Sequence, residues 1–169
     1  LLGVILLASN LRGPMTSVAP LLGMIQEFFT ITASQAGLLT SLPLLVLAIM
    51  SPFCAGLSLR FGLERMLFFA ILAIIAGVLL RSTQSLVLLY VGTGFVGVGI
   101  ALGNVLLPSL VKRDFPHHIA IVTSVYALSM GVAAAIISAS VVPLAQSGFG
   151  WAGALSFSAI LAVISALIW

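Results

Sequence analysis

The sequence predicts an all-α integral membrane protein with six transmembrane helices, and three observations lead to this fold class. Of its 169 residues, 62% are hydrophobic and 5% charged, with a mean hydropathy of +1.37, whereas about a quarter of the residues in a soluble domain are charged. The apolar runs continue for roughly the 20 residues that a helical span needs and lack the alternation over about 10 residues of a membrane β-strand. Polar and turn-forming clusters divide these runs into six segments.

The expected helices lie at about residues 1 to 25, 35 to 56, 66 to 81, 86 to 111, 117 to 146 and 150 to 169. Thr32 and Gln35 fit a capping box that opens the second helix. The third is short for a full crossing, so we expect it to continue beyond Arg81, whose long stem can carry its charge to the interface. Asp114 and Pro116 fit an N-cap and a first-turn proline of the fifth.

Composition also bears on partners and processing. Six basic residues give a formal charge of +3, but they are too dispersed for a nucleic-acid surface, so we expect no nucleic-acid partner. Cys54 stands alone, which rules out an intramolecular disulfide. The chain lacks an initiator Met and starts and stops within apolar runs, which predicts an excerpt of a longer protein. Its first run carries Arg12 and no basic flank, unlike a cleavable signal peptide.

The basic residues predict an orientation. Arg60 and Arg65 lie in the second connection, and Lys112 and Arg113 lie in the fourth, against Arg81 on the other side. Cytoplasmic loops are enriched in Lys and Arg. We therefore expect these two connections and both chain ends to be cytoplasmic.

Arg12 is a charge inside the first predicted span. Such a charge costs about 2.5–3.5 kcal/mol on insertion scales, so it normally faces the bundle interior or a water-filled cavity. At 100° per residue, Ser9 and Thr16 share its face and form one polar stripe, with Asn10 opposite. The acidic residues all lie in or beside connections, so the counter-charge must come from the substrate or from absent sequence: Glu27, Glu64 and Asp114.

The helix around Arg12 is also loosened by Gly13, Pro14 and Pro20, as in transporters whose broken helices offer backbone groups to a ligand. Two interpretations stay open. Arg12 is either a clamp for an anion or a polar ring, or a structural arginine that caps carbonyls or pairs with absent sequence.

The fourth predicted helix has a polar face and a glycine face. The polar face includes Asn104, which bonds either a solute in a central cavity or a neighbouring helix. The glycine face, with Gly92, Gly99 and Gly103, allows another backbone to approach closely.

The fifth predicted helix repeats a small residue at every fourth position, which predicts a packing seam: Ala127, Gly131, Ala135 and Ala139. Tyr126 lies off this seam and either lines the cavity or bonds a backbone carbonyl.

No catalytic or metal-binding set is evident in the sequence. His117 and His118 are adjacent and point about 100° apart on a helix, so they make a poor metal pair and are expected to be solvated. We therefore expect no enzyme, no metal and no cofactor. Helices with a polar centre and nothing reactive indicate a permeation path.

The stretch "LSLRFGLERML" resembles the signature between helices 2 and 3 of the major facilitator superfamily, G-x-L-x-D-R-x-G-R-R. Arg60 and Gly62 match it, while the aspartate position is Leu59 and a later arginine position is Glu64, followed by Arg65. The resemblance implies that Arg60, Gly62 and Arg65 act in conformational gating. The missing aspartate implies a different locking network.

The combination "NLR", "GLLTSLPLL", "RFGLER" and "GNVLLPSLVKRDFP" resembles the cyanate and 2-nitroimidazole transporter family (CynX/NimT) over essentially the whole chain. The resemblance implies the N-terminal six-helix half of a twelve-helix fold, built from two three-helix inverted repeats, with the C-terminal half as its partner. Pro20 and Pro108 recur at the same spacing as the Phe-Gly pairs at 61 and 149, which fits such a repeat. Thr93 and Val96 replace an arginine and a glutamine of the major facilitator pattern for helix 4, which puts standard proton coupling through this half in doubt.

We therefore expect a secondary active transporter of the cell inner (plasma) membrane that moves a small polar or anionic solute, 2-nitroimidazole-like or cyanate-like, by alternating access. Arg12, Thr16, Asn104 and Tyr126 are the expected substrate-binding residues. The alternative is a six-helix membrane subunit that forms a structural or channel-like oligomer, with Arg12 facing its counterpart in a second copy.

Overall fold

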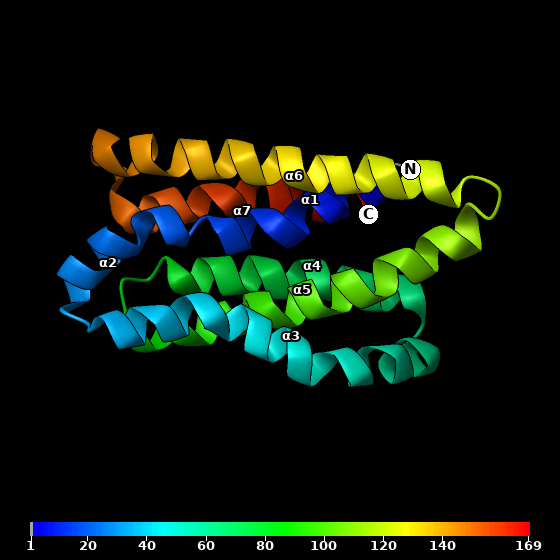
Figure 1. Ribbon diagram of the computed structural model, residues 1–169, viewed down its shortest axis with the longest axis horizontal. Coiled ribbons are helices and arrows are strands. Elements are labelled where there is room, and N and C mark those ends of the chain that lie inside the picture. Colours follow the sequence, from blue (N-terminus) through cyan, green and yellow to red (C-terminus); the bar gives the residue numbers. More distant parts are fainter. Residues whose placement is uncertain (1) are drawn as a thin grey trace.

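Helices make up nearly all of the computed structural model, which describes residues 2 to 169 apart from the side chain of Phe149. Two short elements interrupt the α-helices, the 3-10 turn η1 and the π-helical segment η2 (Figure 1). In chain order the elements are α1 (Leu2–Thr16), η1 (Ala19–Leu21), α2 (Leu22–Phe29), α3 (Ala33–Phe61), α4 (Leu63–Arg81), α5 (Leu86–Asp114), α6 (Ile119–Leu144), η2 (Ala145–Phe149) and α7 (Gly150–Ile168).

Five of the described helices are long and apolar enough to cross a membrane: α3, α4, α5, α6 with its continuation to Gly148, and α7. The first predicted span is instead broken, because α1 ends at Thr16 and the chain restarts as η1 at Ala19. Pro20 stands in the first turn of η1. Proline lacks an N–H and its ring clashes with the preceding turn, which favours a break at this point.

Two helix boundaries test the expected capping signals. The capping box of α3 is confirmed: Gln35 N–H donates to Thr32 Oγ1 at 3.3 Å, and Thr32 N–H donates to Gln35 Oε1 at 3.0 Å. The expected N-cap at Asp114 is wrong. Asp114 is the last residue of α5, and α6 begins at Ile119 after His118, without a side-chain cap.

The expectation that the third helix continues beyond Arg81 is also wrong. α4 starts at Leu63 and stops at Arg81, where Ser82 N–H bonds back to Leu79 and the turn closes. Its 19 residues suffice for a span because the helix gains length at its start. Arg81 does not reach an interface, since it is 1% exposed and points into the bundle.

Glycine sets the closest helix contact, between α4 and α5, which lie side by side in the middle of the bundle (Figure 1). A Cβ added to Gly77 would lie 2.5 Å from the carbonyl oxygen of Gly92, and the converse distance is the same. A Cβ on Gly99 would lie 2.6 Å from the Ala70 carbonyl. Gly92 and Gly99 of the predicted glycine face therefore form a backbone-to-backbone interface with α4. Gly103, the third residue of that face, lies instead against the Leu11 side chain of α1.

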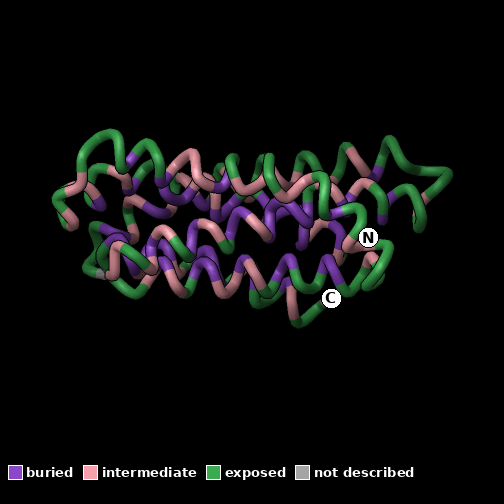
Figure 2. Tube along the Cα trace, turned by 90° about the horizontal axis from the view of Figure 1, so that it is seen from below, coloured by how far each residue is buried: buried purple, intermediate pink, exposed green. Residues whose placement is uncertain are grey.

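The remaining helices flank this pair. α6 packs on α1, α7 lies against α4 and α1, and α3 covers the other side of α5. Buried residues gather along the middle of the bundle and exposed residues along its edges (Figure 2). In the spanning windows 56% of α5 is buried, against 11% of α3 and 6% of α6, so α5 is the central helix.

The expected packing seam on α6 faces away from this bundle. All four of its residues are exposed, namely Ala127, Gly131, Ala135 and Ala139. No neighbouring atom lies within 4 Å of a Cβ built on Gly131. The seam is therefore not a contact among the described helices, because α6 meets α1 with a different face.

Candidate functional site

Arg12, Thr16 and Asn104 line one cavity of about 450 Å³. Its wall comes from α1, the start of η1, α3, α5 and α6, and comprises Leu11, Arg12, Met15, Thr16, Ala19, Thr40, Leu44, Ile100, Asn104 and Met130. Three residues expected at a site from sequence, far apart in the chain, thus meet at one cavity.

The α1 part of the wall is shaped by local hydrogen bonds. Thr16 Oγ1 donates to the Arg12 carbonyl at 3.2 Å and to the Gly13 carbonyl at 3.1 Å. Its one hydrogen is used in this way, so towards a ligand the hydroxyl can only accept. The Arg12 guanidinium has no ion pair or hydrogen-bond partner among the described residues, and Arg12 is exposed.

The α5 part places Asn104 one helical turn after Ile100, so both side chains point the same way. Asn104 is exposed, and its amide has no hydrogen-bond partner in residues 2 to 169. A free amide offers both donors and an acceptor. Asn104 is therefore available to a ligand.

The α3 part was missed by the sequence analysis, which did not single out Thr40. α3 approaches α5 at Gly97, where an added Cβ would lie 2.9 Å from Val46 Cβ and 3.1 Å from Pro43 Cα. This contact brings Thr40 and Leu44 to the cavity edge. The available signal was the spacing of Thr40 and Leu44, which places both on one helical face.

Arg12 is the one charged residue among the ten that line the cavity. No carboxylate of the lining offsets it, so the cavity is positive. In surroundings of low dielectric such a charge attracts an anion or the negative end of a polar solute more strongly than in water.

Two other polar residues of the first span lie elsewhere. Ser9 lines a separate apolar cavity between α1, α6 and α7, and its hydroxyl donates to the Ile5 carbonyl at 2.9 Å, so the expected stripe is wrong at this residue. The 60° between Ser9 and Arg12 is enough for α6 and α7 to cover one and leave the other open. Asn10 is buried on the α7 side, where its Nδ2 donates to the Leu161 carbonyl at 3.3 Å.

Tyr126 is not part of the cavity lining. It is half-buried and packs against the main apolar core, while Met130, one turn further along α6, lines the cavity. His117 and His118 are exposed in the α5–α6 connection. The described residues contain no group of three or more His, Cys, Asp or Glu side chains that could hold a metal ion.

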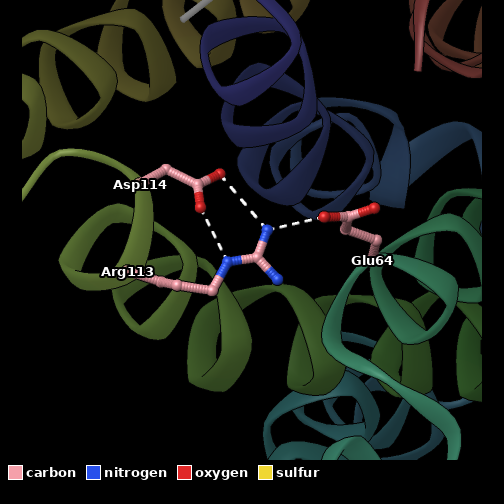
Figure 3. Close-up of polar contacts among 3 residues, drawn as sticks. All are labelled: Glu64, Arg113 and Asp114. Atoms are coloured by element: carbon pink, nitrogen blue, oxygen red, sulfur yellow. Dashed lines mark hydrogen bonds and ion pairs between the residues drawn. The ribbon is translucent and has the colours of Figure 1, made fainter.

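A second polar cluster joins the start of α4 to the end of α5 (Figure 3). Arg113 Nη2 donates to Glu64 Oε1 at 2.6 Å, and Arg113 Nε donates to Asp114 Oδ1 at 2.7 Å. The three side chains are well exposed. This cluster lies at the bundle end where both ends of the described chain also meet (Figure 1).

The expected gating residues surround this cluster without forming it. Arg60 lies over the Phe61 ring at 5.8 Å, and Arg65 has no ion pair among the described residues. Gly62 has φ of 91°, so it provides the turn between α3 and α4 that a side chain would strain. The ion pair is instead made by Glu64, at a position where the sequence departs from the signature.

Comparisons of the sequence with known proteins bear on the family of the chain. The sequence profile of the Major Facilitator Superfamily matches residues 4–169. The chain is 51% identical over 167 residues to the 2-nitroimidazole transporter of Escherichia coli (strain K12). It is 44% identical over 168 residues to the uncharacterized transporter YycB of Bacillus subtilis (strain 168), and 27% identical over 171 residues to the cyanate transport protein CynX of Escherichia coli.

These matches cover 99% of the chain for the first two relatives and all of it for the third. They cover 42% to 44% of the relatives themselves. The chain therefore spans less than half the length of the curated relatives it matches.

Proposed function

Since the chain belongs to the Major Facilitator Superfamily, we propose that it is the N-terminal six-helix half of a secondary active transporter for a small polar or anionic solute. The observation that carries the proposal is the positive cavity lined by Arg12, Thr16 and Asn104. Small-molecule sites have volumes of about 300–1,000 Å³, and this one has about 450 Å³.

The solute proposed is 2-nitroimidazole-like or cyanate-like, as the names of two relatives suggest. Both kinds are small and flat and carry electron-rich oxygen or nitrogen atoms. The guanidinium of Arg12 is planar and presents paired donors, which suits a nitro group or a small anion. Asn104 supplies donors and an acceptor, and Thr16 supplies an acceptor.

Alternating access is the proposed mechanism, with the two three-helix units acting as inverted repeats and the C-terminal half closing the cavity. We assign the bundle end with Arg60, Arg65 and the Arg113 cluster to the cytoplasm of an inner-membrane protein, because basic connections stay inside. Contacts of exposed charges are weak and easily released, so the Glu64–Arg113 pair suits a gate. Tyr126 joins the site in this proposal if α6 turns during the cycle.

The test is uptake of 2-nitroimidazole and cyanate by the full-length transporter in liposomes, with and without a proton gradient. A hydrogen bond to a charged group contributes about 1.5–3 kcal/mol. Arg12→Ala should therefore weaken binding by about tenfold to a hundredfold. Arg12→Lys should recover little, because an ammonium lacks the planar pair of donors.

Lys112→Ala is the matched control, since Lys112 is basic and exposed but lies outside the cavity. It should transport as the wild type does. Binding that survives in folded Arg12→Ala would remove Arg12 from the solute site and leave it a structural role.

A further inference from the structure

Arg81 is a buried cation that the proposed site does not use. It ends α4, is 1% exposed, and donates from Nη1 and Nη2 to the Pro14 carbonyl oxygen, each at 3.1 Å. Its Nε has no partner, and no carboxylate of the described residues forms an ion pair with it. Burying an unpaired charge is destabilising. An ionisable group kept inside a membrane protein at such a cost points to function.

The Pro14 carbonyl lies where α1 breaks. The last carbonyl oxygens of a helix lack hydrogen bonds, because no following turn supplies N–H groups to donate to them. Ser17 Oγ donates to the same oxygen at 2.9 Å, so two side chains converge on this atom. The C-terminus of a helix carries roughly half a negative charge, which a nearby cation offsets. Arg81 therefore caps the broken end of α1.

The neighbouring helices hold Arg81 in this place. A Cβ on Gly92 would lie 2.9 Å from Arg81 Cγ, so the glycine leaves room for the arginine stem against α5. In the next residue, Ser82 Oγ accepts from Ser156 Oγ at 2.8 Å, which attaches the same end of α4 to α7. The arginine stem is thus seated against α5, while the Ser82 contact joins α4 to α7 without touching Arg81.

We propose that Arg81 is a positioning residue for the solute cavity: by capping α1 at Pro14, it orients the half-helix that carries Arg12 and Thr16. Pro14 lies midway between these two residues in the chain, and both line the cavity. Without the cap, the end of α1 is free to turn, and the Arg12 guanidinium loses its fixed direction. This inference rests on the proposed function, because it assigns Arg81 to the same site.

Arg81→Met in the full-length transporter is the test variant, since Met keeps an unbranched stem and removes the donors. We expect its apparent KM for 2-nitroimidazole uptake into liposomes to rise about tenfold. Arg81→Lys, which retains an ammonium donor, should recover part of the loss. The change removes a buried charge without an ion-pair partner, and the Pro14 carbonyl keeps its hydrogen bond from Ser17 Oγ. Arg81→Met should therefore unfold at a temperature equal to or above that of the wild type.

The apparent KM and the unfolding temperature together distinguish a positioning role of Arg81 from a purely structural one. A lower unfolding temperature with an unchanged KM would make Arg81 a structural strut and overturn the inference. If both change, the double variant Arg12→Lys/Arg81→Met decides. Residues that act through one site have overlapping effects, so its loss should be smaller than the product of the single losses. Losses that simply multiply would overturn the positioning role.

Ser82→Ala is the matched control, because it removes the contact with α7 one residue away and leaves the cap intact. Its KM should stay within about twofold of the wild type.

A second readout works without transport. In a background with every other cysteine replaced, Thr16→Cys is labelled with a membrane-impermeant maleimide. Relative to the protein with Arg81 and Ser82 intact, Arg81→Met should change the labelling rate at position 16 severalfold, and Ser82→Ala should leave it unchanged. Equal labelling rates in the Arg81→Met and Ser82→Ala variants would overturn the inference. A wild type that neither binds nor transports 2-nitroimidazole would overturn the choice of solute alone.

Discussion

Arg81 and Arg113 lie at the two ends of the α4 contact network, and their surroundings differ. Arg81 is buried and donates twice to a single carbonyl oxygen. Arg113 is half-exposed and reaches two carboxylates, that of Asp114 beside it on α5 and that of Glu64 at the start of α4. The buried contact has no competing water, so it holds its geometry, while the exposed one competes with water and salt. The comparison teaches that burial, more than the number of contacts, decides how firmly a charged side chain holds two helices together.

The largest effect is expected where α4 and α5 touch. Gly92→Leu would drive a side chain into the Gly77 carbonyl, 2.5 Å from the new Cβ, and into the Arg81 stem. Overpacking of this kind costs about 3 kcal/mol or more when backbone must move. We expect a large drop in unfolding temperature in detergent, measured by intrinsic fluorescence.

Gly94→Leu is its control, because no neighbouring atom lies within 4 Å of a Cβ at Gly94. The two variants add the same side chain two residues apart on one helix. Equal unfolding temperatures would show that the α4–α5 contact does not depend on Gly92.

A moderate effect is expected at the other end of α4. Gly62 has φ of 91°, a conformation that side chains rarely adopt. Gly62→Ala should therefore lower the free energy of unfolding by about 1–2 kcal/mol, as measured by chemical denaturation. Gly56→Ala, in helical backbone with open space around it, should not destabilise the protein. A Gly62→Ala variant as stable as the wild type would mean that the connection relaxes freely.

The smallest effect on stability is expected at the ion pair itself. Glu64→Gln removes the 2.6 Å contact with Arg113, but both side chains are about half-exposed or more. Exposed ion pairs contribute little and are screened by salt. The unfolding temperature of Glu64→Gln should match that of the wild type at low and high salt. Arg65→Gln is the control, and its unfolding temperature should also match that of the wild type. A clear loss in Glu64→Gln alone would show that this end is as fixed as the Arg81 end.

Much of the fold follows from local sequence. The capping box at Thr32 and the glycine face of α5 involve residues within one helix, so their spacing is informative on its own. The N-cap expected at Asp114 is wrong, although a carboxylate two residues before a proline is typical of an N-cap. In the structure, α5 continues through Asp114, and its carboxylate accepts from Arg113.

The candidate site was predictable in part. Arg12, Thr16 and Asn104 stood out as polar residues in apolar spans, which is a signal of composition alone. Thr40 did not stand out, because its place at the cavity depends on how closely α3 approaches Gly97. Ser9 was assigned wrongly for the same reason, since which edge of α1 is covered depends on α6 and α7.

The sequence by itself determined that the chain is helical and apolar, where most helices begin and end, and which polar residues lie within apolar segments. These properties depend on hydropathy, on the period of 3.6 residues and on local hydrogen bonds, all of which are encoded within single segments. Tertiary structure decided the partner of Arg81, the pairing of Glu64 with Arg113 and the set of residues around the cavity. Each of these contacts joins helices distant in the chain, and their approach is set by side-chain packing between helices, which no local pattern specifies.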